Sequence, residues 1–122
     1  MTINIKLLRQ LTKAYGPSGY EDEISKIIFN HLKKLDLKPK KDFHNTVKIT
    51  MGKGQKKILV TTHIDEIGIV VNHIDERGFL KVSPIGFQYD EGMSGRRVIF
   101  KNGKVGILIK EGNDNDVLFL LA

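Results

Sequence analysis

The stretch Lys57-Ile58-Leu59-Val60-Thr61-Thr62-His63-Ile64-Asp65-Glu66-Ile67-Gly68-Ile69-Val70-Val71 decides how the rest of the sequence is interpreted. Its run Ile58–Val60 is continuously apolar, which is typical of a strand covered on both faces. The run leads into a histidine and two acids, and α/β enzymes place their sites where strands end. We therefore expect a buried strand that delivers these polar residues to a functional site.

Two helices are predicted before this stretch. Apolar residues recur at helical spacing over about residues 3–15, with Thr2 or Asn4 as the N-cap. A Gly-Pro-Ser-Gly break at residues 16–19 ends this helix. The pattern Ser18-x-x-Glu21 is that of a capping box, which predicts a second helix from this point to about Leu35.

The rest of the chain predicts strands joined by turns. The strands are expected at residues 37–42 (an edge strand containing Pro39), 46–51, 58–60, 67–74, 79–82, 97–100, 105–108 and 117–121. Residues 52–55 are a predicted hairpin turn, and residues 83–87 are a predicted loop or bulge. The pair Asn102-Gly103 favours a type I′ turn between two strands.

These elements indicate an α/β fold whose two halves differ. Residues 1–66 hold both predicted helices, the buried strand and the candidate site, whereas residues 67–122 are nearly all predicted β-structure. The length of 122 residues suits one compact domain, and 40% hydrophobic with 28% charged residues is typical of globular proteins. We place the only internal boundary near Glu66.

Composition excludes several classes of function. The chain has no cysteine, which excludes disulfides and thiolate metal sites and favours a cytoplasmic location. No apolar run is long enough to cross a bilayer, and the N-terminus lacks the layout of a signal peptide. The net charge of +6 comes from scattered lysines without interleaved aromatic residues or a phosphate-binding glycine loop. We therefore expect a solvated basic surface, with neither a nucleic acid nor a membrane as partner.

His63 and Asp65 are the candidate site residues. Side chains alternate along a strand, so these two are expected on one face and Glu66 on the other. A neutral imidazole is a good ligand for zinc or cobalt, and a nearby carboxylate fixes its tautomer. We interpret His63 as a metal ligand and Asp65 as the acid that supports it. The structural alternative is a His–Asp pair that only satisfies its own hydrogen bonds at a strand end.

The tetrapeptide His-Ile-Asp-Glu occurs a second time, at His73–Glu76, and offers a comparison. Its acids fall in a predicted turn, where aspartate bonds the local backbone. One histidine does not hold a metal, because hydrolytic zinc needs about three protein ligands. Residues 67–122 offer no obvious source of them, and neither His31 nor His44 has a spacing that completes a site with His63.

Five segments of the chain resemble one known family in their order and spacing. They are Tyr15-Gly16-Pro17-Ser18-Gly19-Tyr20-Glu21, Asn45-Thr46-Val47, His63-Ile64-Asp65-Glu66-Ile67-Gly68, Gly78-Phe79-Leu80 and Gly95-Arg96-Arg97-Val98. Together they are similar to the N-terminal part of the dinuclear metallo-aminopeptidases that form tetrahedral particles. That family includes glutamyl and lysyl aminopeptidases, some once labelled endoglucanases. The resemblance covers nearly the whole chain but not Asp114–Ala122.

The resemblance implies a fold and a chemistry. The fold is an α/β peptidase sandwich, incomplete here, which is interrupted by a β-barrel-like domain for subunit association. Residues 1–66 would belong to the catalytic domain and residues 67–122 to the association domain. His63 would bind one of two divalent ions, zinc or cobalt, and Asp65 would be the catalytic acid that supports that site. In the family, the metals polarise the carbonyl of a peptide substrate and activate a water, while a glutamate is the general base.

The family's other metal ligands and its general base lie further along than these 122 residues reach. We therefore expect a fragment of a metal-dependent aminopeptidase that is inactive alone, and whether it binds a metal by itself stays open. The alternative is a non-catalytic association module derived from that family, and a weaker third hypothesis is a small independent metal-binding protein. Uncovered apolar surface on the predicted strand also favours a homo-oligomer or a complementary chain.

Overall fold

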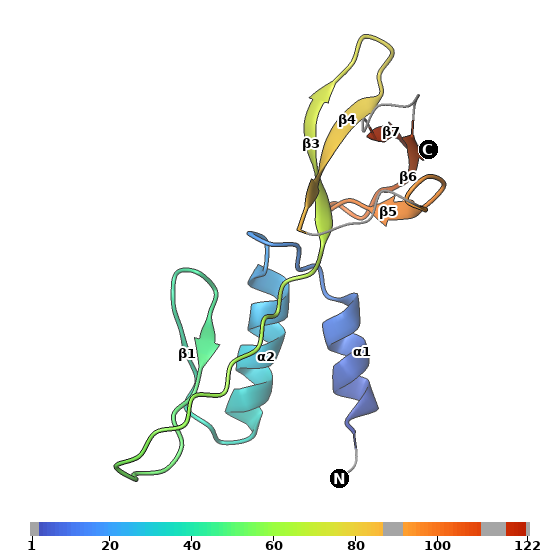
Figure 1. Ribbon diagram of the computed structural model, residues 1–122. Helices are drawn as coiled ribbons and strands as arrows, with labels where there is room; N and C mark the ends of the chain where they lie inside the picture. Colours follow the sequence, from blue (N-terminus) through green and yellow to red (C-terminus); the bar gives the residue numbers. More distant parts are fainter. Residues whose placement is uncertain (1–2, 87–91, 111–116, 122) are drawn as a thin grey trace. The chain divides into compact units, whose positions relative to one another are not determined.

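The computed structural model describes residues 3–86, 92–110 and 117–121, which fall into two compact units, Met1–Asp65 and Glu66–Ala122. The first unit contains α1 (Ile5–Lys13), α2 (Asp22–Lys34) and two short strands, β1 (Lys40–Lys41) and β2 (Val47–Lys48). The second contains β3 (Gly68–Ile74), β4 (Leu80–Ile85), β5 (Arg97–Ile99), β6 (Val105–Lys110) and β7 (Val117–Leu121) (Figure 1). Among the described residues, no helix has the length and apolar character that crossing a membrane requires.

Helix α1 forms where the apolar spacing predicts it. Asn4 is its N-cap, and the side-chain oxygen Oδ1 accepts a hydrogen bond from the N–H of Leu7 at 3.0 Å. This bond satisfies one of the N–H groups that a helix start leaves without an intrahelical partner. The cap at Asn4 is therefore confirmed, while Thr2 lies outside the described residues. The helix is shorter than predicted, because Ala14 already has an extended backbone.

Helix α2 is also present, but the predicted capping box is wrong. The N-cap is Glu21, which makes no side-chain capping bond, and the helix starts at Asp22. The carboxylate of Glu21 instead accepts the N–H of Gly19 at 2.6 Å, and the hydroxyl of Ser18 is engaged elsewhere. Asp22 and Glu23 in the first turn favour the start electrostatically, because carboxylates there complement the helix dipole.

The chain after α2 folds back as a small antiparallel pair, β1 with β2, in which Lys41 lies opposite Val47. Both strands are shorter than the predicted ranges 37–42 and 46–51. Asp42 organises the turn between them, because its Oδ1 accepts the N–H groups of His44 and Thr46. The fully buried Ser25 of α2 donates its hydroxyl to the carbonyl of Asn45 at 2.9 Å, which fastens this turn to the helix.

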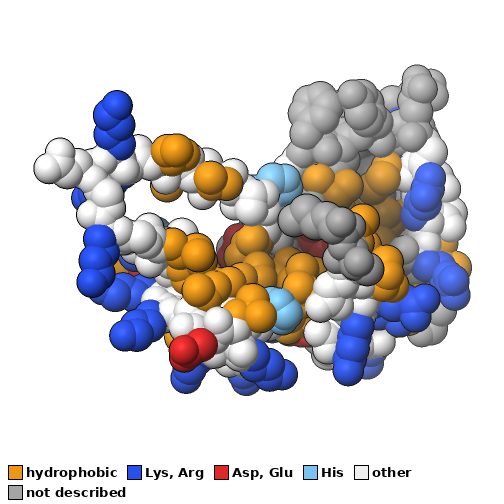
Figure 2. Space-filling view, turned by 90° about the horizontal axis from the view of Figure 1, so that it is seen from below, with side chains coloured by type: hydrophobic (Ala, Val, Ile, Leu, Met, Phe, Trp, Pro, Cys, Tyr) orange, Lys and Arg blue, Asp and Glu red, His pale blue; other side chains and the backbone are white. Residues whose placement is uncertain are grey.

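The prediction of a buried strand at Ile58–Val60 is wrong for the described chain. These residues have no strand assignment, and Ile58, Leu59 and Val60 are 91%, 87% and 89% exposed. A strand needs partners for its backbone groups, and among the described residues none pairs with this run. The predicted hairpin turn at residues 52–55 therefore has no second strand to lead into. Figure 2 shows hydrophobic side chains exposed at the surface of the described residues.

The second unit is a five-stranded antiparallel sheet in the order β3–β4–β7–β6–β5. Strand β4 runs through Ile85, so the predicted loop or bulge at residues 83–87 is wrong for residues 83–85. Gly86 lies just after the strand, and Phe87 is outside the described residues. Pro84 lies opposite Ile69 of β3, whereas β7 pairs with β4 only over residues 80–82. A proline is tolerated in a strand where its missing N–H takes no part in a ladder. The sheet's irregularity lies in β3 instead, between Val71 and His73.

The β5–β6 hairpin forms as predicted, but its turn is not type I′. The N–H of Gly103 bonds the carbonyl of Phe100, and the N–H of Phe100 bonds the carbonyl of Lys104, both at 2.8 Å. Only Gly103 has a positive φ, of 82°, whereas a type I′ turn requires positive φ at both central residues. The loop therefore has three residues, a type I turn followed by a left-handed glycine.

The core of the sheet is centred on Leu80 and Leu108, which are 6% and 1% exposed. Both residues lie opposite Phe119 of β7 in the ladder, so they occupy one rung across three strands. Partly buried apolar side chains pack around them: Ile69, Val82, Met93, Val98 and Phe100. The described residues thus form two helices and antiparallel sheets, in keeping with part of an α/β fold.

Candidate metal-binding site

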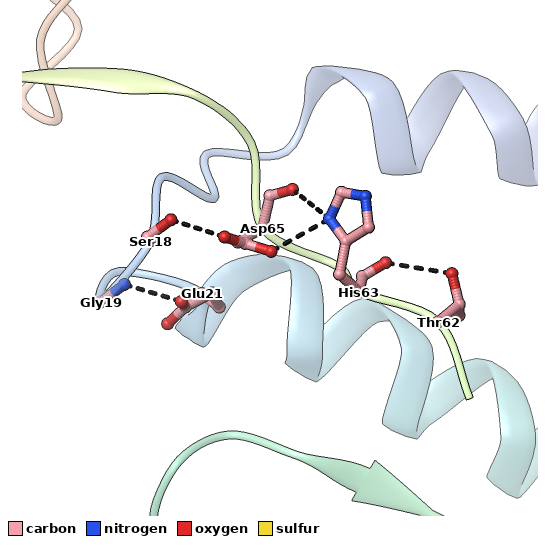
Figure 3. Close-up of polar contacts among 6 residues, drawn as sticks. All are labelled: Ser18, Gly19, Glu21, Thr62, His63 and Asp65. Atoms are coloured by element: carbon pink, nitrogen blue, oxygen red, sulfur yellow. Dashed lines mark hydrogen bonds and ion pairs between the residues drawn. The ribbon is translucent and has the colours of Figure 1, made fainter. Parts of the chain in front are cut away.

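His63 lies near the end of the first unit, and its side chain is 84% exposed. Its Nδ1 is 3.0 Å from both the carboxylate Oδ1 and the backbone carbonyl of Asp65 (Figure 3). A carbonyl can only accept a hydrogen bond, so Nδ1 carries the proton when the ring is neutral. That tautomer leaves the lone pair on Nε2, the nitrogen that is free to meet a metal ion.

Asp65 is held from two sides. Its Oδ1 meets His63, and its Oδ2 accepts a hydrogen bond of 2.5 Å from the hydroxyl of Ser18. The Ser18 hydrogen bond, followed by that from His63, holds the pKa of the Asp65 carboxyl below its ordinary value. A carboxylate kept ionised in this position is a good acceptor for the Nδ1 proton of the imidazole.

The turn at residues 16–19 brings Ser18 to Asp65, 47 residues away in the chain. Gly16 permits this turn, because a Cβ there would lie 3.1 Å from Cγ2 of Ile24 and 3.9 Å from the carbonyl oxygen of Ile64. A Cβ at this position would crowd Ile24 of α2, while its distance to the Ile64 carbonyl oxygen is an ordinary van der Waals contact. The Gly-Pro-Ser-Gly sequence therefore has a second role besides ending α1.

Sequence reasoning missed the role of Ser18. The predicted helix cap and the observed bond to Asp65 use the same hydroxyl, and the bond to an ionised carboxylate is the stronger one. The local signal, Ser18-x-x-Glu21, fits a capping box equally well. A hydrogen bond between residues so far apart in the chain depends on the fold of the whole unit, so no local sequence pattern predicts it. Glu66, the other acid at this point, is exposed and belongs to the second unit.

The second His-Ile-Asp-Glu copy behaves differently, as predicted. Oδ1 of Asp75 accepts the N–H groups of Arg77 and Phe79 at 3.0 and 2.9 Å, and Oδ2 meets the Arg77 guanidinium at 3.3 Å. Burial alone would raise the pKa of Asp75, but these hydrogen bonds and the nearby cation outweigh burial and lower it. Asp75 therefore closes the β3–β4 turn, whereas Asp65 holds a histidine.

The chemistry of His63 fits a single metal ligand, and the structure brings no second one to it. Among the described residues, no three side chains of histidine, aspartate, glutamate or cysteine come together in a way that could hold an ion. His31 is elsewhere, in a groove of about 830 Å³ between the two helices. The groove is lined by apolar and polar side chains, and its charged residues are mostly basic, with Lys6, Arg9, Lys13 and Lys34 against Glu23.

Comparisons with known proteins give one consistent answer. The family model for M42 glutamyl aminopeptidase matches residues 45–111. A putative aminopeptidase of Acetivibrio thermocellus is 40% identical over 112 residues, which are 91% of this chain and 34% of the relative. The lysyl aminopeptidase of Pyrococcus furiosus is 31% identical over 113 residues, or 87% of this chain and 33% of the relative. The chain therefore spans about a third of the length of these curated relatives.

Solved structures show the same fold. The TET aminopeptidase of a marine-sediment Thaumarchaeota archaeon superposes with a TM-score of 0.84 at 24% identity, covering 97% of this chain and 38% of that one. The TET1 peptidase of Pyrococcus horikoshii, which can assemble into a tetrahedron or a large octahedral shell, gives 0.79 at 24% identity. It covers 97% of this chain and 40% of its own.

Proposed function

The chain belongs to the M42 family of aminopeptidases, and on that premise we propose that it supplies part of a metal-dependent aminopeptidase site. In this proposal His63 is a ligand of a divalent metal, zinc or cobalt, and Asp65 is the residue that positions its ring. The substrates are peptides that lose their N-terminal residue. The single observation that carries the proposal is the contact of Nδ1 of His63 with both acceptors of Asp65.

The geometry supports this role through the tautomer it selects. Histidine ligands commonly donate their second N–H to a carboxylate or a carbonyl, which fixes the ring and raises its basicity. Here the same nitrogen faces both kinds of acceptor, and the exposed ring leaves Nε2 accessible. A divalent metal, when bound, would polarise the substrate carbonyl and lower the pKa of a bound water. The chain's own part is to direct the Nδ1–H of His63 at the acceptors of Asp65 and to keep that carboxylate ionised through Ser18.

We further propose that this site draws its remaining ligands from residues other than those described. A hydrolytic site needs about three protein ligands for one ion, and His63 has no such companions among the described side chains. Activity of the chain by itself is therefore expected to be absent. Residues 1–66 would be the N-terminal part of a catalytic domain, and residues 67–122 would belong to a barrel-like association domain.

Metal binding at His63 is tested by NMR of the four histidines, with the second His-Ile-Asp-Glu copy as the matched control. Addition of Co²⁺ should broaden the ring signals of His63 before those of His73, and His63→Ala should remove the strongest effect. Asp65→Asn should weaken binding by about 10- to 100-fold, as loss of an outer-shell partner does. Equal broadening of the His63 and His73 signals would show that His63 is not a ligand.

The absence of activity has its own test. With Zn²⁺ or Co²⁺ present, hydrolysis of aminoacyl p-nitroanilides by the chain alone should stay at background. Turnover that disappears in His63→Ala would contradict the proposal that the site needs further residues. It would leave the ligand role of His63 intact, so the two claims are separable.

The second candidate function is a non-catalytic association module. It is favoured by the second unit, whose described residues form a five-stranded antiparallel sheet with its own core. The Pyrococcus horikoshii peptidase of the same fold can assemble into a tetrahedron or a large octahedral shell, which supports self-association as a function to test. A homo-oligomer that persists in His63→Ala, without metal, would favour this function, whereas dissociation on metal removal would contradict it.

A further inference from the structure

The short turn before α2 has the geometry of a type II turn. The N–H of Tyr20 bonds the carbonyl of Pro17 at 2.8 Å, which closes the turn. Gly19, at its third position, has a φ of 86°, whereas Ser18, at its second, does not have a positive φ. A type II turn requires a positive φ at the third position alone. Ser18 therefore lies at a corner of the chain whose backbone conformation is well defined.

The turn is held by contacts of its own residues. The carboxylate of Glu21 accepts the N–H of Gly19 at 2.6 Å, and Pro17 is buried. A Cβ at Gly19 would meet no atom within 4 Å, so the left-handed backbone, and not a lack of space, favours glycine there. All of these contacts lie within residues 17–21. The turn is therefore a local support from which the hydroxyl of its second residue is presented.

Asp65 uses its two carboxylate oxygens for two different partners (Figure 3). Its Oδ2 accepts the hydroxyl of Ser18 at 2.5 Å, and its Oδ1 lies 3.0 Å from Nδ1 of His63. The side chain of Asp65 is 38% exposed, and a side chain that is open to water exchanges among its staggered rotamers unless a contact holds it. The bond from Ser18 is a contact of this kind, and it selects the rotamer that turns Oδ1 towards the imidazole.

We propose that Ser18 is the positioning residue of the His63–Asp65 pair, presented by the type II turn of residues 17–20. The proposal rests on the proposed function, in which His63 is a metal ligand. Ser18 acts through Asp65, because fixing one carboxylate oxygen also fixes the other against the Nδ1–H of the ring. The backbone carbonyl of Asp65 accepts from the same nitrogen, so loss of Ser18 weakens the orientation of the ring without abolishing it.

The first test needs no metal, because it measures the rotamer of Asp65 directly. Three-bond NMR couplings to the side-chain carboxyl carbon should show a single χ1 rotamer in the unaltered chain and in Ser18→Thr, which keeps the hydroxyl. Ser18→Ala should show couplings averaged over several rotamers. The matched control Ser25→Ala removes another hydroxyl of the same unit, one that bonds the carbonyl of Asn45, and should leave Asp65 in its single rotamer. A single rotamer in Ser18→Ala would overturn the proposal.

The second test measures the affinity for Co²⁺ from the broadening of the His63 ring signals. Ser18→Ala should weaken binding by about 3- to 10-fold, less than the loss of a direct outer-shell partner causes. Ser18→Thr should restore the affinity, and Ser25→Ala should leave it unchanged. In an Asp65→Ala background, Ser18→Ala should have no further effect, because a residue that acts through another loses its role with it.

The two tests separate this proposal from the proposed function. An equal further loss in the Asp65→Ala background would overturn the proposal, since Ser18 would then act by a route other than Asp65. If Co²⁺ does not bind at His63 in any variant, the proposed function fails. The rotamer measurement in the metal-free chain then still decides whether Ser18 positions the His63–Asp65 pair.

Discussion

The replacement Leu108→Ala tests whether the second unit depends on the Leu80–Leu108 core. Leu108 is 1% exposed, so the three carbons lost on truncation are all buried. At about 0.8 kcal/mol per carbon, the transfer contribution alone is about 2.4 kcal/mol. The cavity that the truncation leaves in the core lowers the free energy of unfolding further, so the total loss is about 3–4 kcal/mol.

The neighbouring position provides the control. Ile109→Ala also removes three carbons from β6, but Ile109 is 37% exposed and lies on the other face of the strand. Ile109→Ala should lower the free energy of unfolding by about 1.5 kcal/mol, because only the buried part of the side chain contributes and no closed cavity forms. Because a unit of this size has a total stability of only about 3–8 kcal/mol, Leu108→Ala can leave it largely unfolded. Leu108→Met keeps the volume, costs less than about 1.5 kcal/mol, and serves as the folded variant.

Hydrogen exchange read by mass spectrometry on peptides covering residues 97–110 measures these losses directly. In the expected result, opening free energies fall for Leu108→Ala by at least twice the amount found for Ile109→Ala, while Leu108→Met stays near the unaltered protein. If both alanine variants lower the opening free energy equally, or if Leu108→Ala lowers it by less than about 1 kcal/mol, the core is not centred on Leu80 and Leu108.

Three further predictions concern local structure. Asn4→Ala should lower the stability of α1 by about 1 kcal/mol, seen as lost helicity by circular dichroism, whereas Asn4→Asp should retain the cap. Because Asp75 has a lowered pKa in the folded state, its stabilising effect is complete above its ordinary value of 3.8 and is lost as the pH falls through the lower folded pKa. Acid unfolding of the second unit should therefore become shallower in Asp75→Asn, and an unchanged pH profile would count against the turn contacts. Gly103→Ala should destabilise the β5–β6 hairpin by about 1 kcal/mol through its positive φ, measured as a lower urea midpoint with an unchanged slope.

The sequence predicts the elements whose determinants are local. The apolar spacing and the cap residue Asn4 define α1, and Asp75 with its following glycine defines the β3–β4 turn. Both depend on contacts within four residues. The β5–β6 hairpin is likewise predicted from local sequence. Its turn type depends on the number of residues in the loop, which the dipeptide Asn102-Gly103 alone does not determine.

The elements that the sequence does not predict depend on distant partners. A continuous apolar run such as Ile58–Val60 indicates a strand covered on both faces, but covering and pairing come from other parts of a fold. The hydroxyl of Ser18 could cap α2 or donate to Asp65, and which of these it does depends on the position of Asp65. For the candidate site, the pairing of His63 with Asp65 follows from their spacing, whereas the second partner of Asp65 becomes visible only in three dimensions.

The Ser18–Asp65 hydrogen bond closes a loop of 47 residues, which has a consequence for the order of folding. Closing a flexible loop of that length costs about 3 kcal/mol plus a constant, more than one hydrogen bond to a carboxylate returns. The loop must therefore already be shortened by other contacts, such as that of Ser25 with Asn45 and the close approach at Gly16. The bond from Ser18 to Asp65 therefore depends on the rest of the unit being folded, whereas the contact of His63 with Asp65, two residues away, can form without it.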